Sequence, residues 1–114
     1  MIKMSIKLER MNNTFVKEIS YILHNEIKDE NIKFVSVTGC DITNDLSYAK
    51  VYVTVLDKEK KGITMKALEG AKGFIRGELS KRVEIRHTPE LRFIFDDSIE
   101  YGEKIEKLIE DLHK

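Results

Sequence analysis

Three glycines and two cations share one segment of the chain, and these residue types could bind a phosphate group. Apolar residues recur at steps of three and four, as in a helix that lies on a core: Leu68, Ala71, Ile75 and Leu79. Gly70, Gly73 and Gly77 interrupt this pattern. Each glycine disfavours a helix by about 1 kcal/mol relative to alanine, which predicts two helices meeting at a bend. The second helix would begin near Gly73, where free backbone N–H groups favour a phosphate, with Lys72 and Arg76 beside them.

The charges of the chain are unevenly distributed. The 114 residues carry 20 Lys and Arg against 20 Asp and Glu, so the net charge is zero. From residue 96 onward seven acidic residues face three lysines, a balance of −4, so the first 95 residues carry +4. The segment from Lys72 to Arg92 has six basic residues against three acidic ones. This basic zone favours a nucleic-acid partner, although a solvated mixed surface would show the same counts.

Length and composition limit the class of protein. The 114 residues suit one domain, and an apolar content of 41% with a charged content of 35% is typical of a soluble globular protein. No run reaches the roughly 18 apolar residues of a membrane span, and the first residues do not resemble a secretory signal. The single cysteine, Cys40, excludes an internal disulfide and a multi-cysteine zinc site. We therefore expect a cytoplasmic protein with no metal and no cofactor.

Residues that could catalyse a reaction do not form a motif. The histidines His24, His87 and His113 are scattered along the chain. Asp96 and Asp97 are adjacent, but they stand between a predicted strand and a predicted helix. At this position Asp97 interacts favourably with the helix dipole and Ser98 can cap the helix, so the pair needs no catalytic role. No phosphate-loop lysine motif, dinucleotide fingerprint or metal-ligand spacing is present. The sequence therefore favours a binding protein over an enzyme.

Hydrophobic periodicity predicts the elements that precede the glycine segment. A helix is expected from about Asn12 to Lys28, capped by Asn12 or Asn13, with Arg10 in an irregular segment before it. Its apolar face consists of Phe15, Ile19, Ile22, Leu23 and Ile27. Two alternating runs, at 33–42 and 47–56, predict an antiparallel hairpin around a turn at 43–46. Gly39 is expected to mark a bulge in the first strand.

The elements after the hairpin complete a two-layer domain. A polar loop at 57–62 leads to the bent helix pair at about 63–83, followed by a strand at 90–96. In that strand Leu91, Phe93 and Phe95 are expected to face the core. Asp97 and Ser98 would cap a last helix at 98–112, whose apolar stripe is Ile105, Leu108, Ile109 and Leu112. The prediction is an α+β fold with a three-stranded sheet and helices on one face, within a single domain (1–114) whose core is about 10–96.

Four separate stretches, in this order and at this spacing, carry a family resemblance. They are Asp45-Leu46-Ser47-Tyr48-Ala49-Lys50-Val51-Tyr52-Val53, Gly73-Phe74-Ile75-Arg76, Thr88-Pro89-Glu90-Leu91-Arg92-Phe93, and Asp97-Ser98 with Gly102. From Arg10 to Ile109 the chain closely resembles ribosome-binding factor A. The resemblance implies a type II KH fold and a non-catalytic role in late maturation of the small ribosomal subunit. It also implies binding to immature 30S particles and 16S rRNA, a link to processing of the rRNA 5′ end, and growth in the cold.

The resemblance also bears on the glycine segment. The family replaces the usual KH glycine loop with an Ala-x-Gly bend, which Ala71-Lys72-Gly73 matches. Because Gly70 precedes this bend, Gly70-Ala71-Lys72-Gly73 also matches the GxxG pattern of ordinary KH domains. We interpret Gly70 as a glycine that is tolerated beside a kink and not as part of an ordinary KH loop. Many relatives carry a long polar C-terminal tail, whereas this chain ends at Lys114.

Eight residues are predicted to contact RNA. Lys72 and Arg76 flank the bend, and the alternative is that they are solvated helix charges. Arg82 and Arg86 lie near the end of the second helix, where cations stabilise a helix by roughly 0.3–1 kcal/mol without any ligand. The full set is Ala71, Lys72, Gly73, Arg76, Arg82, Arg86, Arg10 and Lys17.

Two other functions remain open from the sequence. A generic single-stranded-RNA KH binder would use the literal GxxG, and a protein-interaction module would use the sheet face or the acidic last helix. Tyr48 and Tyr52 share one strand face, where they could stack on bases or pack against a neighbouring element. No small-molecule substrate is expected, and since no heptad repeat demands dimerisation, a monomer is expected.

Overall fold

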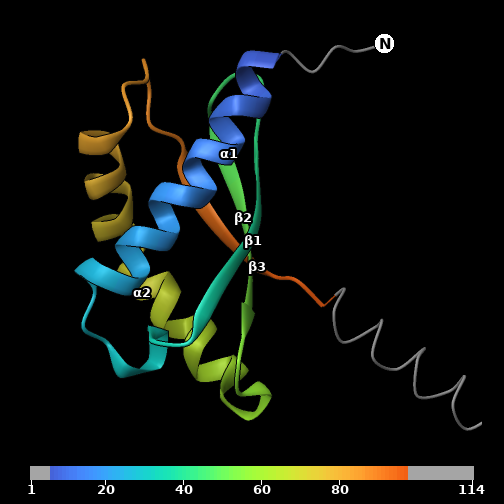
Figure 1. The fold of residues 1–114 in the computed structure, drawn as a ribbon, viewed down its shortest axis with the longest axis vertical. Helices are drawn as coiled ribbons and strands as arrows, with labels where there is room; N and C mark the ends of the chain where they lie inside the picture. The colour runs from blue at the N-terminus through green and yellow to red at the C-terminus, as the bar shows by residue number, and fades with distance from the viewer. Residues whose placement is uncertain (1–5, 98–114) are drawn as a thin grey trace, which may run out of the picture.

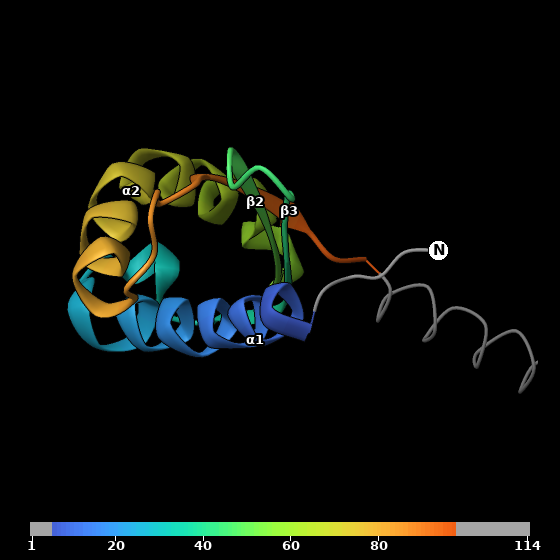
Figure 2. The ribbon, with the colours of Figure 1, turned by 90° about the horizontal axis from the view of Figure 1, so that it is seen from above.

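Two long helices cover one face of a three-stranded sheet in the computed structural model, which describes residues 6–97 (Figure 1). Helix α1 spans Ile6–Tyr21 and continues as a π-helical turn, Ile22–Glu26, while α2 spans Lys61–Arg82. Figure 2 shows α1 and α2 along two sides and the strands along a third. The buried residues of the core come from these helices and strands. The α+β architecture predicted from the sequence is confirmed for this part of the chain.

The sheet has the order β1-β2-β3. Strands β1 (Val35–Ile42) and β2 (Tyr48–Val55) form the predicted antiparallel hairpin, and β3 (Glu90–Phe95) pairs with β2 in parallel. A parallel pair needs a long crossover, which α2 supplies. Short 3₁₀ turns at Glu30–Ile32 and Lys58–Lys60 lead into β1 and α2.

The predicted bulge at Gly39 is confirmed. The pairing of β1 with β2 shifts register between Val37 and Gly39, so Thr38 has no register partner in β2. Its hydroxyl lies 3.3 Å from the carbonyl oxygen of Tyr52 and donates to Asp96 Oδ2 at 2.7 Å, so the extra residue ties the hairpin to the end of β3. β-Bulges commonly change the direction of a side chain in this way, here that of Thr38.

Helix α1 begins earlier than the sequence analysis predicted. Arg10 lies within the helix, not in an irregular segment, and Asn12 is no cap. The apolar stripe continues through Leu8 and Met11, which pack against the core, so the helix gains from extending towards its N-terminus. Asn12 Oδ1 accepts a hydrogen bond from the backbone N–H of Ile42 at 2.9 Å and thereby ties α1 to the end of β1.

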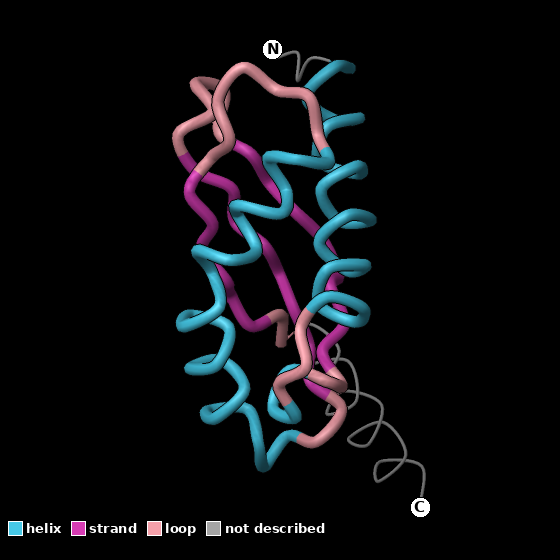
Figure 3. The backbone as a smooth tube through the Cα atoms, turned by 90° about the vertical axis from the view of Figure 1, so that its left-hand side faces the viewer, coloured by secondary structure: helices cyan, strands magenta, loops and turns pink. Residues whose placement is uncertain are grey.

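The glycine segment is bent, as predicted, but it forms one continuous helix, so the predicted division into two helices is wrong (Figures 1 and 3). Figures 1 and 3 show the axis of α2 changing direction about half-way along, but the backbone stays helical from Lys61 to Arg82. The three glycines weaken the helix by roughly 3 kcal/mol in total. Burial of apolar side chains on both sides of the bend compensates for this loss; they are Leu68, Ile75 and Leu79.

The core draws on all the elements. Its buried members include Phe15 and Ile19 from α1, Val51 from β2, and Leu91 and Phe93 from β3. Phe95, predicted to be a core residue, is half-buried because it lies at the end of β3, with Lys61 Nζ 4.1 Å from its ring centre. The predicted last helix at 98–112 and its cap at Ser98 lie outside the described residues.

Candidate nucleic-acid interface

The outward side of α2 carries the predicted bend residues. Gly70, Gly73 and Gly77 are exposed, as is Phe74, while Ile75 between them is buried in the core. Ala71 is partly buried against the core and Gly73 is open to solvent. Because the helix is unbroken here, the backbone N–H groups after Gly73 are not free in the way that a second helix start would leave them.

The packing of the protein does not require these three glycines. A Cβ atom built at Gly70, Gly73 or Gly77 would meet no atom within 4 Å, and none of the three has a positive φ angle. Alanine would therefore fit at each position and would favour the helix by about 1 kcal/mol. The outward side of α2 thus exposes bare backbone, which allows close approach of another molecule.

Lys72 and Arg76, the two cations predicted to flank the bend, have different surroundings. Lys72 Nζ lies 2.8 Å from Glu69 Oε1. An ion pair this accessible to solvent contributes little to stability, so Lys72 can leave Glu69 to bind a ligand. Arg76 is partly buried and donates from Nε and Nη2 to the carbonyl oxygen of Thr88, at 3.1 and 2.7 Å. Arg76 therefore holds the segment before β3 in place, and contact with a phosphate would require these bonds to break.

Arg82 joins the two helices. Its Nη2 lies 2.8 Å from Glu26 Oε1 and its Nη1 3.6 Å from Glu18 Oε1, and its guanidinium stands 4.7 Å from the ring centre of Tyr21. These contacts link the last turn of α2 to the C-terminal half of α1. Because two carboxylates neutralise it, Arg82 is a weaker candidate for a phosphate contact than its position in the sequence predicted.

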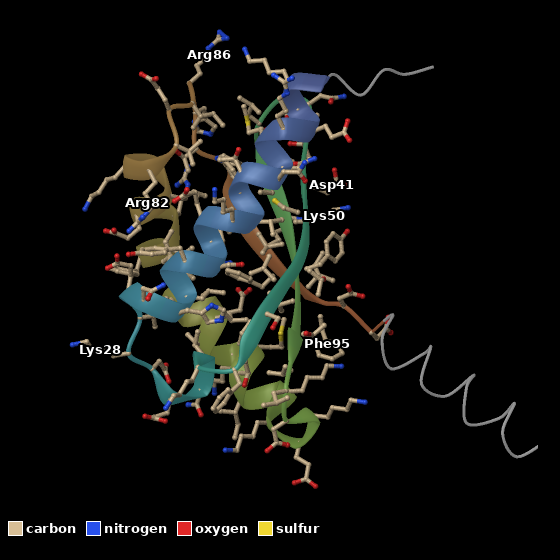
Figure 4. All side chains as sticks on the ribbon, viewed as in Figure 1. Lys28, Asp41, Lys50, Arg82, Arg86 and Phe95 are labelled. Atoms are coloured by element: carbon tan, nitrogen blue, oxygen red, sulfur yellow. The ribbon has the colours of Figure 1, made fainter. Side chains whose placement is uncertain are left out.

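The remaining cations of the predicted set point to solvent. Arg10 and Lys17 lie seven residues apart on α1, hence on one side of the helix, and both are exposed. Arg86 is exposed in the segment between α2 and β3 (Figure 4). None of the three forms an ion pair with another residue in the range 6–97. The eight predicted residues are therefore spread over both helices and the following segment, and only some of them are accessible.

Two further exposed cations on the helices were not among the predicted residues. Lys66 is exposed on α2 one turn before Gly70, and Lys7 is exposed in the first turn of α1. The four-residue spacing from Lys66 to Gly70 could have identified the first. For Lys7 no such indication existed in the sequence, because the helix was predicted to begin only at about Asn12, whereas α1 begins at Ile6.

Metal-binding clusters and membrane-spanning helices are absent from the described residues. Between residues 6 and 97 no group of three or more His, Cys, Asp or Glu side chains could hold a metal ion. His24 Nε2 lies 2.8 Å from the carbonyl oxygen of Val35, which gives this histidine a structural partner. Over the same residues no helix combines the length and apolar character of a membrane span.

The Cys40 thiol is held in its neutral form. Burial raises the pKa of this thiol from 9.0 to about 12, and the charge of Asp41 adds to the shift. Because the folded pKa lies above the unfolded one, the free energy of unfolding should fall as the pH rises from about 9 to 12. Urea titrations across this range should show the fall in the wild type and a flatter profile in Cys40→Ala. An identical profile for both proteins would contradict the prediction.

Nearly the whole chain matches one family of proteins. The family described as Ribosome-binding factor A matches residues 7–109. Ribosome-binding factor A of Staphylococcus carnosus (strain TM300) is 53% identical over 110 residues, which cover 96% of each chain. This chain belongs to the ribosome-binding factor A family. The resemblance in its four sequence stretches is thereby confirmed.

Solved structures of ribosome-binding factor A share the fold. The solution structure of a putative member from Thermotoga maritima has a TM-score of 0.69 at 25% identity, covering 82% of this chain and 91% of that one. A homology model of the Thermus thermophilus protein, fitted into the cryo-EM map of a 30S–RbfA complex, has a TM-score of 0.64 at 21% identity and covers 75% of this chain and 91% of that one. The described order of helix, strand, strand, helix and strand agrees with the implied KH-like fold.

Proposed function

We propose that this protein is a non-catalytic assembly factor that binds immature small ribosomal subunits through 16S rRNA and assists their late maturation. The supporting observation is the 53% identity to a ribosome-binding factor A over 96% of both chains. A more distant relative is described in a complex with the 30S particle. The proposal includes assistance to rRNA 5′-end processing and to growth in the cold, in the cytoplasm and as a monomer.

The proposed contact surface is the outer side of the two helices. Arg10 and Lys17 on α1 and Lys72 on α2 would approach phosphates, while Gly70 and Gly73 would let the RNA backbone come close to α2. Arg86 would extend the same basic surface beyond the end of α2. Arg76 and Arg82 would hold these elements in place, since their side chains already bind Thr88, Glu18 and Glu26. Phosphate contacts of this kind fix position and orientation on RNA more than they read its sequence.

Co-sedimentation with purified ribosomal particles over a salt series tests the proposal. The wild type should pellet with small subunits in preference to large subunits and joined ribosomes. If about five phosphates are neutralised, the log–log slope of affinity against salt should be on the order of −3.5 to −4.5. Equal binding to all particles, or a slope near zero, would overturn the proposal. Weak salt dependence would favour a protein-interaction module, and equally tight binding to short unstructured RNA would favour a generic KH binder.

A triple charge reversal locates the contact. The variant combines Arg10→Glu, Lys17→Glu and Arg86→Glu, and it should bind small subunits more weakly. The log–log slope of affinity against salt should become shallower by about 3, one unit for each lost phosphate contact. The matched control is Lys28→Glu, Lys50→Glu and Lys60→Glu, which changes the net charge equally at exposed positions outside the proposed surface. Equal losses in both variants would show attraction by overall charge and not by this surface.

A further inference from the structure

A surface groove lies at the end of the molecule where α1 begins. It has a volume of about 330 Å³ and combines the first turns of α1, the turn between β1 and β2, and the segment between α2 and β3. Figure 4 shows Arg86 at this end, beside the start of α1. Its floor and rim are formed by Leu8, Met11, Leu46, Ile85, Lys7 and Arg86. We call this site the end groove.

The end groove is apolar inside and basic at its rim. Its four apolar side chains are partly buried and pack against the core, so the floor is held in place. Lys7 and Arg86 are exposed at the rim, and neither forms an ion pair with another described residue. Asn44 and Glu84 add an amide and a carboxylate to the lining. This set offers apolar contact to a flat ring, polar partners for its edge, and cations for neighbouring phosphates.

Two other surface hollows have a different charge. The hollow beside Phe34 and Ile27 carries two lysines against two carboxylates, and the hollow beside Leu56 carries Lys60 against Glu30 and Asp57. The end groove carries two cations against Glu84, so its lining has a net positive charge. A polyanion that carries flat aromatic bases therefore suits the end groove better than either of the other two hollows.

The backbone at Leu46 gives an independent reason to consider the end groove functional. Leu46 has a φ angle of 63° and is the one residue other than glycine with a positive φ among those described. A left-handed conformation is unfavourable for a residue with a Cβ, and glycine or asparagine is the usual choice. The turn is nevertheless well bonded, since Leu46 N–H donates to the carbonyl oxygen of Thr43 at 2.9 Å. The strain places an apolar side chain in the end groove, and strain of this kind concentrates at functional sites.

We propose that the end groove binds one unstacked base of single-stranded RNA, with Lys7 and Arg86 on the flanking phosphates. This inference rests on the proposed function and adds a base-binding site to its phosphate contacts. An unpaired base pressed between apolar side chains and bonded at its edge is the usual mode of recognition for single-stranded RNA. The amide of Asn44 can both donate and accept, and Glu84 can accept from an exocyclic amino group. The volume of about 330 Å³ lies at the lower end of the roughly 300–1,000 Å³ of small-ligand sites.

Fluorescence anisotropy with short RNA tests the end groove. The probes are labelled oligonucleotides about six nucleotides long, one set for each base and one abasic chain of equal charge. The wild type should bind at least one base-containing probe about 5-fold or more tightly than the abasic chain, since one stacked base contributes roughly 1–3 kcal/mol. Equal affinity for the abasic chain and all base-containing probes would overturn the inference.

Leu46→Gly is the variant that separates binding from folding. Glycine suits the left-handed backbone and removes the apolar side chain, so the fold should persist while the preference over the abasic chain disappears. Tyr21→Ala, at an exposed aromatic residue away from the end groove, should keep the preference. If Leu46→Gly retains it while folding normally, the base binds elsewhere and the inference fails.

Co-sedimentation keeps this inference distinguishable from the proposed function. Wild-type protein that selects small subunits but shows no preference for bases would overturn the end groove alone. Protein that prefers bases in the end groove but binds no ribosomal particle would overturn the proposed function. The end groove would then be a site for single-stranded RNA with no link to rRNA.

Discussion

The variant Gly70→Ala, Gly73→Ala, Gly77→Ala should be more stable than the wild type by about 2–3 kcal/mol and should bind small ribosomal subunits less well. The gain in stability follows because alanine fits at all three exposed positions and favours a helix by about 1 kcal/mol at each. The loss of binding follows from the proposed approach of RNA to the bare backbone of α2. Urea unfolding and co-sedimentation measure the two effects.

A fourth glycine of the same helix provides the control. Gly62 also has no atom within 4 Å of a built Cβ, but it lies in the first turn of α2, away from the bend. Gly62→Ala should not reduce binding. Unchanged binding in the triple variant would remove α2 from the proposed interface, and lower stability would show that the bend itself needs glycine.

Ile75→Ala should lower the free energy of unfolding by about 2–5 kcal/mol. Ile75 is fully buried at the centre of α2, and truncation of a buried aliphatic side chain removes its burial energy and leaves a cavity. Domains of this size are stable by about 5–15 kcal/mol, so this change should shift the urea midpoint strongly. Far-UV circular dichroism during urea unfolding measures it.

The neighbouring residue provides a matched control. Phe74 is 49% exposed, so Phe74→Ala removes a larger side chain next to Ile75 but should cost far less stability. A loss in Phe74→Ala as large as that in Ile75→Ala would mean that the outer side of α2 is packed against another part of the chain. The proposed outer binding surface would then be wrong.

The hairpin and the third strand could be predicted from the sequence because their signals are local. Alternation in β2, turn residues at 43–46 and glycine within β1 together specify an antiparallel pair with a bulge. The family could be recognised for a similar reason, since four short stretches keep their order and spacing. Charge imbalance along the chain also indicated a basic region before the acidic end.

The start of α1 could not be predicted so well, because capping residues are local and ambiguous. Asn12 reads as a cap in the sequence, but its side chain binds the backbone of Ile42, thirty residues away. Helix length was decided by the burial of Leu8 and Met11 against the core, which a cap signal does not reveal.

The sequence by itself determined the hairpin, the third strand, the family and the candidates for RNA contact. Only the tertiary structure decided which cations are accessible. Arg76 and Arg82 look equivalent to Arg86 in the sequence, yet packing turns the first towards Thr88 and the second towards Glu18 and Glu26. The structure also brought Lys7, Leu46 and Arg86 together in one groove. The physical reason is that charge and periodicity are properties of each residue and its neighbours, whereas availability depends on partners that the fold brings from distant parts of the chain.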